Sequence, residues 1–479
     1  MSASYTRRTF LATSGLAAAA LASVPQPAKQ PSGDVAQKQP GEVSVWVTDD
    51  HHVLSRVTPV KWQIARAPAL SNAISLDPQK KSQEILGFGA AFTDAACFML
   101  NQLSPAARDQ LFHTLFHSSE MGFSVCRSCI GASDYSATLY SYDDGDVDPE
   151  LKRFSIGHDR AYILPIIRAA RKVNPDLFLF ASPWSPPGWM KANGSMLGGS
   201  MRRAHMPSYA NYFLKFLQAY EDEGVPVQAV TIQNEVDTDQ DGRMPACIWP
   251  QEYEVDFVTS HLGPLFRRTG TKTKIWLIDH NYNLWGRALA ELESPGLRDY
   301  ANAIAWHGYV GQPEWMDRVH NAYPDVDMFW TEGGPDYTAA GYASDWAKWS
   351  AMFTGILRNC CRSITAWNFA LDERGRPNIG PFSCGGLVTI DSQNKAISHS
   401  GQFRAFAHFS HFLPRGSRRF ESQSKDNDIQ HVGFETPAGQ NVLVLTNSGS
   451  DRNCQLRLDN YAASLSLSQN SVTTLVWSS

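Results

Sequence analysis

The chain has 479 residues, of which 43% are hydrophobic, which allows a core larger than that of one typical domain. Its 42 basic and 47 acidic residues give a net charge of −5, a balance that gives no sign of nucleic acid or an anionic membrane surface as a partner. The 14 tryptophans favour carbohydrate only weakly, because tryptophan stacks on sugar rings but also fills protein cores.

Residues 1–22 have the features of an export signal. A twin arginine at Arg7 and Arg8 precedes an Ala/Leu-rich stretch, and Ala20-Leu21-Ala22 has the small-x-small form of a cleavage site. A disordered basic N-terminus is the alternative. Residues 23–41 have the composition of a flexible leader, and no later run is long and apolar enough for a transmembrane anchor. We expect export by the twin-arginine route to the periplasm or the extracellular space.

Short β-like runs alternate with amphipathic, helix-like stretches between residues 84 and 371. Eight such repeats predict an α/β fold with parallel strands and helical crossovers, closed into a (β/α)8 barrel that we assign to residues 84–413. A doubly wound open sheet is the alternative, but it needs a reversal of strand order and usually a Gly-rich phosphate loop. The expected strands are 85–92, 123–130, 177–182, 228–233, 274–279, 303–307, 328–331 and 363–368.

The two flanks of this region, residues 42–83 and 414–479, contain short, partly alternating runs separated by turn residues. This pattern is typical of antiparallel strands. We therefore expect a side β-sandwich built from both chain ends. The expected strands are 43–47, 60–64, 71–76, 429–435, 441–447, 454–458 and 471–477.

Polar and aromatic residues stand where the eight barrel strands are expected to end, and the chemistry of such barrels gathers at these C-terminal ends. An ordinary strand-end loop explains any one of them but explains the whole set poorly. In chain order they are Thr93-Asp94, Arg127, Pro183-Trp184, Asn234-Glu235, Asp279-His280, His307 with Tyr309, Glu332 and Trp367-Asn368.

Two of these strand ends carry glutamates, Glu235 and Glu332. A single glutamate at such a position is more often a salt-bridge partner. A pair of carboxyl groups facing one pocket is what hydrolysis of a glycosidic bond requires, one to protonate the leaving oxygen and one to attack the sugar or activate water. The amide of Asn234 beside Glu235 is suited to hold a sugar hydroxyl.

Several longer motifs resemble glycoside hydrolase family 30, and within it the glucosylceramidase-like enzymes. They occur in family order from about residue 43 to the C-terminus, so the resemblance covers nearly all of the chain after the leader. The motifs are GFGAAFTDAA at 87–96, Arg127 with IGASD at 130–134, ASPWSPPGWMK at 181–191, QNE at 233–235, TEG at 331–333 and Trp367-Asn368.

The resemblance implies a retaining β-glycosidase with Glu235 as general acid/base and Glu332 as nucleophile. It implies that Arg127 and His307 brace the nucleophile and the floor of the pocket. It also implies a set of residues that bind the sugar. These are Asp94, Trp184, Asn234 and Trp367, to which we add Asn368 and Tyr309 at the same strand ends.

The two carboxyl groups of a retaining enzyme lie about 5 Å apart. We expect Arg127 to lower the pKa of Glu332, and the charge of Glu332 to raise the pKa of Glu235. Asp94 could grip two adjacent hydroxyls of the sugar, or instead cap the helix that it opens. Val236 follows Asn-Glu, where the family commonly has proline, and no tyrosine stands near Met244, where family members often have one. Because of these two differences, the sequence does not predict which aglycone the enzyme accepts.

The substrate class predicted is a β-linked glucoside, either a glucosylceramide-like glycolipid or a β-glucan. Alternatives on the same scaffold are an endo-β-1,6-glucanase, a β-xylosidase and a β-fucosidase, and a carbohydrate-binding protein without catalysis is an alternative of another class. A metallohydrolase that uses Asp279, His280 and His307 lacks a recognised ligand spacing. We therefore expect no metal and no cofactor.

Overall fold

The computed structural model describes residues 40–66, 68–70, 72–425 and 428–478. The predicted export signal and all but the last two residues of the leader lie outside these residues. Within the described part of the chain, no helix combines the length and the apolar character needed to cross a membrane.

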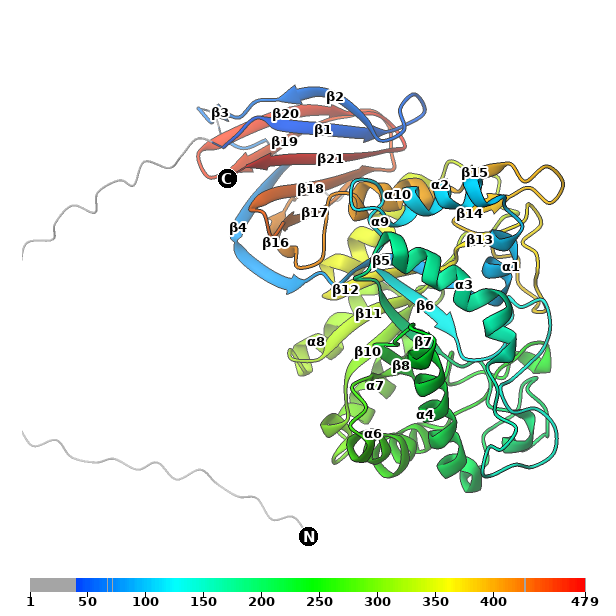
Figure 1. The fold of residues 1–479 in the computed structure, drawn as a ribbon. Helices are drawn as coiled ribbons and strands as arrows, with labels where there is room; N and C mark the ends of the chain where they lie inside the picture. The colour runs from blue at the N-terminus through cyan, green and yellow to red at the C-terminus, as the bar shows by residue number, and fades with distance from the viewer. Residues whose placement is uncertain (1–39, 67, 71, 426–427, 479) are drawn as a thin grey trace, which may run out of the picture. The chain divides into compact units, whose positions relative to one another are not determined.

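Eight parallel strands close into a barrel, which confirms the predicted α/β fold (Figure 1). The hydrogen-bonded order around the barrel is β10-β11-β12-β5-β6-β7-β8-β9. Each expected barrel strand overlaps an observed one. The strands are β5 (Gly87–Phe92), β6 (Val125–Cys129), β7 (Phe178–Ser182), β8 (Ala229–Thr231), β9 (Lys274–Asn281), β10 (Ala301–His307), β11 (Asp327–Glu332) and β12 (Cys361–Asn368).

Helices follow most of these strands, as a parallel sheet requires of its crossovers. Ser104 caps one of these helices, since its side chain accepts a hydrogen bond from the N–H of Ala107 and proline opens the helix. The helices are α1 (Asp94–Asn101), α2 (Pro105–Phe116), α3 (Gly157–Val173), α4 (Met206–Asp222), α5 (Gln251–Asp256), the π-helix η4 (Phe257–Leu262), α6 (Gly263–Thr269), α7 (Trp285–Leu292), α8 (Met316–Ala322), α9 (Trp346–Arg358) and α10 (Gly401–Ser410).

Short 3-10 helices and a small sheet complete the barrel domain. The 3-10 helices are η1 (Gly188–Met190), η2 (Arg203–His205), η3 (Gln240–Gly242), η5 (Tyr282–Leu284), η6 (Leu297–Asp299) and η7 (Pro313–Trp315). The sheet consists of β13 (Ala370–Leu371), β14 (Val388–Ile390) and β15 (Ile397–His399).

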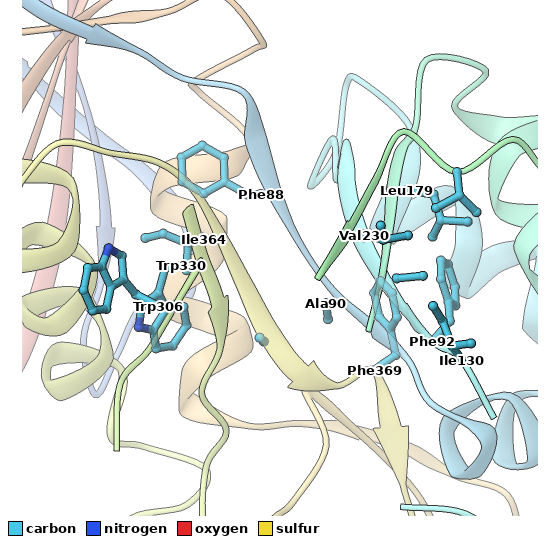
Figure 2. Packing of buried hydrophobic residues seen from close by; sticks show 14 of the residues in the cluster. Phe88, Ala90, Phe92, Ile130, Leu179, Val230, Trp306, Trp330, Ile364 and Phe369 are labelled. Atoms are coloured by element: carbon cyan, nitrogen blue, oxygen red, sulfur yellow. The ribbon is translucent and has the colours of Figure 1, made fainter. Parts of the chain in front are cut away.

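Alternation along the barrel strands separates an inner from an outer core. Phe180, Trp276 and Phe329 belong to the inner cluster, with the ring centroids of Trp276 and Phe329 4.1 Å apart. Their neighbours face the helices, as Figure 2 shows for Trp306 and Trp330 among the buried side chains. The next inward positions toward the strand ends are polar, so the apolar inner layer forms the floor under a polar pocket.

The flanking strands of both chain ends form one ten-stranded antiparallel and mixed sheet, in the order β2-β1-β21-β18-β17-β16-β4-β19-β20-β3. The prediction that both chain ends build the side domain is confirmed by the pairing of β1 with β21. The strands are β1 (Val43–Thr48), β2 (Ser55–Val60), β3 (Gln63–Ile64), β4 (Ala73–Glu84), β16 (Arg418–Gln423), β17 (Ile429–Glu435), β18 (Gln440–Asn447), β19 (Arg452–Leu458), β20 (Tyr461–Leu467) and β21 (Ser471–Ser478).

Helix α9 connects this sheet to the barrel. The hydroxyls of Ser350 on α9 and Thr446 on β18 are 2.6 Å apart, and the indole of Trp346 donates to the carbonyl of Asn470. Both strand and helix residues contribute to the same apolar cluster. The side sheet therefore packs against α9, one of the outer helices of the barrel.

Candidate active site

Glu235 and Glu332 reach one pocket because the backbone departs from regular strand geometry at both of them. The register of β10 against β11 shifts after Trp306, so Glu332, the last residue of β11, lies opposite His307. Glu235 lies four residues beyond the end of β8 with φ 55°, and its N–H donates to the carbonyl of Asp279 at 3.0 Å. Such left-handed backbone at a non-glycine residue costs about 1–3 kcal/mol and is typical of functional sites.

Arg127 is a fully buried cation under the pocket. Its guanidinium donates to Glu332 Oε2 at 2.5 Å, to Asp279 Oδ2 at 2.7 Å and to Asn234 Oδ1 at 2.8 Å. Trp184 lies against one side of it, with the guanidinium carbon 4.6 Å from the ring centroid. Arg127 therefore holds Glu332 by a hydrogen bond and is not among the residues that line the pocket; its bracing role stays a prediction.

Asp279 links Arg127 to His307. Besides Arg127 it accepts hydrogen bonds from the hydroxyls of Thr231 and Thr331, each at 2.7 Å, and its Oδ1 lies 3.0 Å from His307 Nε2. Burial opposes its ionisation, but the charge of Arg127 and these hydrogen bonds hold its pKa well below the ordinary range. Asp279 is thus a permanent carboxylate that orients two cations.

His307 stands between the two glutamates. Its Nδ1 is 3.3 Å from Glu235 Oε1, and its Nε2 is 4.0 Å from Glu332 Oε2. Burial disfavours the imidazolium, but the charge of Glu332 and the hydrogen bonds with Asp279 and Glu235 raise the pKa of His307 to about 9. At neutral pH the imidazole is therefore protonated in the empty site.

The two glutamates have pKa values opposite to those that the sequence predicts. Burial and the charge of Glu235 raise the pKa of Glu332 in spite of Arg127 and His307. The pKa of Glu235 is lowered although burial opposes this, because His307 makes its hydrogen bond to Glu235. The sequence does not reveal that the imidazolium lies nearer to Glu235, and this proximity reverses the order.

The pocket above this network has a volume of about 440 Å³. A larger hollow of about 780 Å³ beside β3 and β20 has no carboxylate among its described lining residues, so it offers no acid/base pair. The catalytic pocket is lined by Asp134, Trp184, Asn234, Glu235, Thr238, Gln240, Met244, His280, Asn281, Tyr309, Glu332, Trp367, Phe382 and Cys384.

Four of the predicted sugar-binding residues lie in this lining. Trp184 and Trp367 stack on each other, with centroids 4.9 Å apart and planes 21° apart. Asn234 lines the pocket, and its Oδ1 accepts a hydrogen bond from Arg127. The hydroxyl of Tyr309 donates to Glu332 Oε1 at 3.1 Å. Their substrate-binding roles remain predictions.

Asp94 and Asn368 are not among the residues that line the empty pocket, and their predicted role in binding the sugar stays a prediction. Asp94 is 1% exposed, and its oxygens accept from the N–H of Ala137, from Tyr162 and from the ring of His158 at 2.6 Å. Asn368 is also buried, and its Oδ1 accepts from Thr93 at 2.8 Å. Both side chains hold loops and helices in place behind the pocket.

Two other residues of the site, Asp134 and Gln240, do not follow from strand ends, and a third, His280, stands at a predicted strand end without a predicted role in sugar binding. Asp134 lines the pocket with an oxygen that has no hydrogen-bond partner in the structure. Gln240 donates to Glu235 Oε2 at 2.9 Å. His280 lies 3.6 Å from Glu235 Oε1. Asp134 is in the IGASD motif and could have been found from it, whereas Gln240 carries no sequence signal.

Comparison with known proteins matches two family descriptions to this chain. The "Glycosyl hydrolase family 30 TIM-barrel domain" matches residues 85–413 and the "Glycosyl hydrolase family 30 beta sandwich domain" matches residues 416–475. An endo-1,6-beta-D-glucanase of Neurospora crassa is 33% identical over 77% of this chain and 80% of its own length.

Two further proteins are similar over most of the chain. The lysosomal acid glucosylceramidase of Mus musculus is 29% identical, with 79% of this chain and 78% of that protein covered. A solved structure of the endo-beta1,6-glucanase BT3312 superposes with a TM-score of 0.82 at 28% identity, covering 91% of this chain and 99% of that one. The chain belongs to glycosyl hydrolase family 30 and is a glycoside hydrolase that acts on β-glycosidic substrates.

Proposed function

We propose that this enzyme is a retaining endo-β-1,6-glucanase. The main support for this reaction type is that the carboxyl groups of Glu235 and Glu332 lie in one pocket, on either side of the His307 imidazole. Two carboxyl groups at the sugar are the requirement of double displacement. The β-1,6 linkage is supported by similarity to the Neurospora glucanase and to BT3312, and this reading replaces glucosylceramide as our main substrate.

In the proposed mechanism Glu332 attacks the anomeric carbon while Glu235 donates a proton to the leaving oxygen. Arg127 holds the attacking carboxylate at 2.5 Å. In the empty site the pKa of Glu235 is lowered and that of His307 is raised, and His307 Nδ1 lies 3.3 Å from Glu235 Oε1. We assign this contact as the path by which the proton reaches Glu235 when substrate is bound. After the glycosyl–enzyme forms, Glu235 removes a proton from water.

The mouth of the pocket is suited to a sugar on the leaving side. Tyr309 and Phe382 line the pocket and are 44% and 43% exposed, so each presents a large part of its aromatic side chain to solvent. Such apolar faces pack against the C–H faces of sugar rings. A chain that continues past the cleaved bond, as in a glucan cut internally, would contact both residues.

Glucosylceramide is the second candidate, supported by similarity to the mouse glucosylceramidase. Val310 follows Tyr309 in the chain and is 52% exposed; a lipid could pack against the apolar parts of Tyr309 and Phe382, which line the pocket, and against Val310 next to them. Export by the twin-arginine route stays part of the proposal, on the basis of Arg7, Arg8 and the stretch that follows them.

The linkage is tested by initial rates on a linear β-1,6-glucan, on glucosylceramide in mixed micelles and on a β-1,4-xylan, each with Glu332→Gln as the matched control. We expect the glucan to be cut fastest and to give a ladder of oligosaccharides from the start of the reaction. Release of glucose alone would contradict internal cleavage. A faster reaction on glucosylceramide would refute the β-1,6-glucan assignment and leave the two-glutamate mechanism intact.

A further inference from the structure

We propose that Glu235, His280 and His307 form a binding site for Zn²⁺, and that occupancy of this site reversibly inhibits the enzyme. The inhibitory part rests on the proposed role of Glu235 as acid/base. One ligand atom from each of the three residues lies within 4.8 Å of the other two. Two imidazoles and a carboxylate are a donor set that suits Zn²⁺ and leaves a fourth position open.

The distances around Glu235 fit a tetrahedral ion. Zn–N and Zn–O bonds of about 2.0–2.2 Å place neighbouring ligand atoms about 3.3–3.6 Å apart. Glu235 Oε1 lies 3.3 Å from His307 Nδ1 and 3.6 Å from His280 Nδ1. The carboxylate oxygen therefore already stands at the ligand-to-ligand spacing from both rings.

Each histidine also has the outer partner that metal-binding histidines usually have. The far nitrogen of His307 lies 3.0 Å from Asp279 Oδ1, and the far nitrogen of His280 lies 2.7 Å from Asp237 Oδ1. A carboxylate on the far nitrogen fixes the ring and the tautomer and leaves the near nitrogen as the ligand. Both near nitrogens, the Nδ1 atoms, lie toward Glu235.

The Nδ1 atom of His280 has no hydrogen-bond partner in the described structure. His280 is 7% exposed, and a buried polar atom without a partner costs free energy unless something binds it. His280 is one of the residues that line the catalytic pocket. A nitrogen without a hydrogen-bond partner is free to bind a metal ion, which supports the site independently of the distances.

The backbone explains why two consecutive residues of β9 face the site. Ile278 and Asp279 have φ values of 73° and 46°, and the register of β9 against β10 shifts between Ala305 and Trp306. This bulge turns Asp279 and His280 toward the same end of the barrel, where a regular strand would alternate them. Asp237 follows Val236, in the loop that departs from the usual Asn-Glu-Pro.

Zinc at this site blocks catalysis because it occupies the oxygen that carries the proton. A Zn²⁺ ion bound to Glu235 Oε1 and His307 Nδ1 takes the place of the proton between these atoms, which lie 3.3 Å apart. The leaving oxygen then receives no proton. We expect the loss to be greatest for substrates with poor leaving groups and to be reversed by a chelator.

To test this, the untagged, folded enzyme is titrated with ZnCl₂. Residual hydrolysis of the β-1,6-glucan is measured before and after EDTA is added to remove the ion. In parallel, Co²⁺ replaces Zn²⁺, because four-coordinate Co²⁺ absorbs visible light far more strongly than six-coordinate Co²⁺. Binding is thus measured without any activity. Asp237→Asn, which removes only the outer partner of His280, should raise the zinc inhibition constant about 10- to 100-fold.

His280→Ala should raise the inhibition constant further, relative to its own activity without zinc, and should remove the strong Co²⁺ absorption. The matched control is His117→Ala, at the C-cap that follows α2. His113 and His117 stack at the surface with centroids 4.4 Å apart, a pair that could hold zinc away from the pocket. This variant should be inhibited like the wild type.

Zinc inhibition and Co²⁺ absorption that are both unchanged in His280→Ala would overturn the site. Loss of inhibition in His117→Ala would overturn it in favour of the surface pair. Strong Co²⁺ absorption that depends on His280, together with undiminished hydrolysis, would support the metal site and refute the role of Glu235 in the proposed function.

Discussion

His307 links the stability of the protein to pH in a way that the structure quantifies. The pKa of this buried ring rises from 6.5 to about 9 on folding, which corresponds to about 3 kcal/mol of interaction that favours the folded state. Because the folded pKa lies above the unfolded one, this contribution is fully present below pH 6.5 and is lost as the pH rises through 9.

The perturbation that isolates this effect is His307→Asn, which removes the titration and keeps a polar side chain. Urea unfolding followed by tryptophan fluorescence gives the free energy of unfolding of wild type and variant from pH 6 to above pH 9. The difference between the two should fall by about 3 kcal/mol over this range. A difference that stays constant, or grows with pH, would refute the buried imidazolium.

His408 provides a control with the opposite sign. This ring is buried between Thr48 and Thr474, at 2.7 and 2.9 Å, and burial lowers its pKa from 6.5 to about 3. A neutral folded ring disfavours folding when the unfolded ring protonates, so its contribution falls as the pH drops below 6.5. The difference between wild type and His408→Gln should therefore be flat above pH 6.5 and change below it.

Three further variants test other parts of the site. Arg127→Met leaves two buried carboxylates without their cation and should cost about 3–5 kcal/mol in urea unfolding. Arg127→Lys, which keeps the charge, should cost less, and equal losses would argue against a stabilising role of that charge between Glu332 and Asp279. Asp134→Asn should lower kcat/KM about 10- to 100-fold with an unchanged thermal midpoint, whereas Asp94→Asn should lower the midpoint. The reverse pattern would identify Asp94, and not Asp134, as the sugar ligand. Gln240→Ala should slow glucan cleavage about tenfold but hardly affect an aryl glucoside with a good leaving group, and equal losses on both would exclude action through Glu235.

The barrel was predictable because its strands are short apolar runs separated by helix patterns, and the polar residues at their ends stand out against such runs. The side sheet was less so. Strand β20 (Tyr461–Leu467) has the sequence YAASLSL, in which four of seven residues are Ala or Ser. Strand β16 (Arg418–Gln423) begins with two arginines. Both are stabilised by pairing with strands that the sequence does reveal, an interaction that local propensity does not contain.

The sequence predicted which residues stand at the strand ends, but it did not predict the contacts between residues that are far apart in the chain. Glu235 and Glu332 follow from strand ends, but so does Asp94, and the pattern alone does not tell a pocket from a buried contact with His158 and Tyr162. The order of the two glutamate pKa values depends on the position of His307 relative to each, which no spacing in the sequence encodes.

The central claim, that Glu332 attacks the sugar and Glu235 handles the proton, is tested most directly by one product. Glu235→Ala is given an aryl β-glucoside with a good leaving group in the presence of azide, and the glycosyl azide is identified by NMR. We predict a faster reaction that yields the β-glucosyl azide, because azide then attacks a glycosyl–enzyme held on Glu332. Formation of the α-glucosyl azide would show that Glu235 is the nucleophile and would contradict the account.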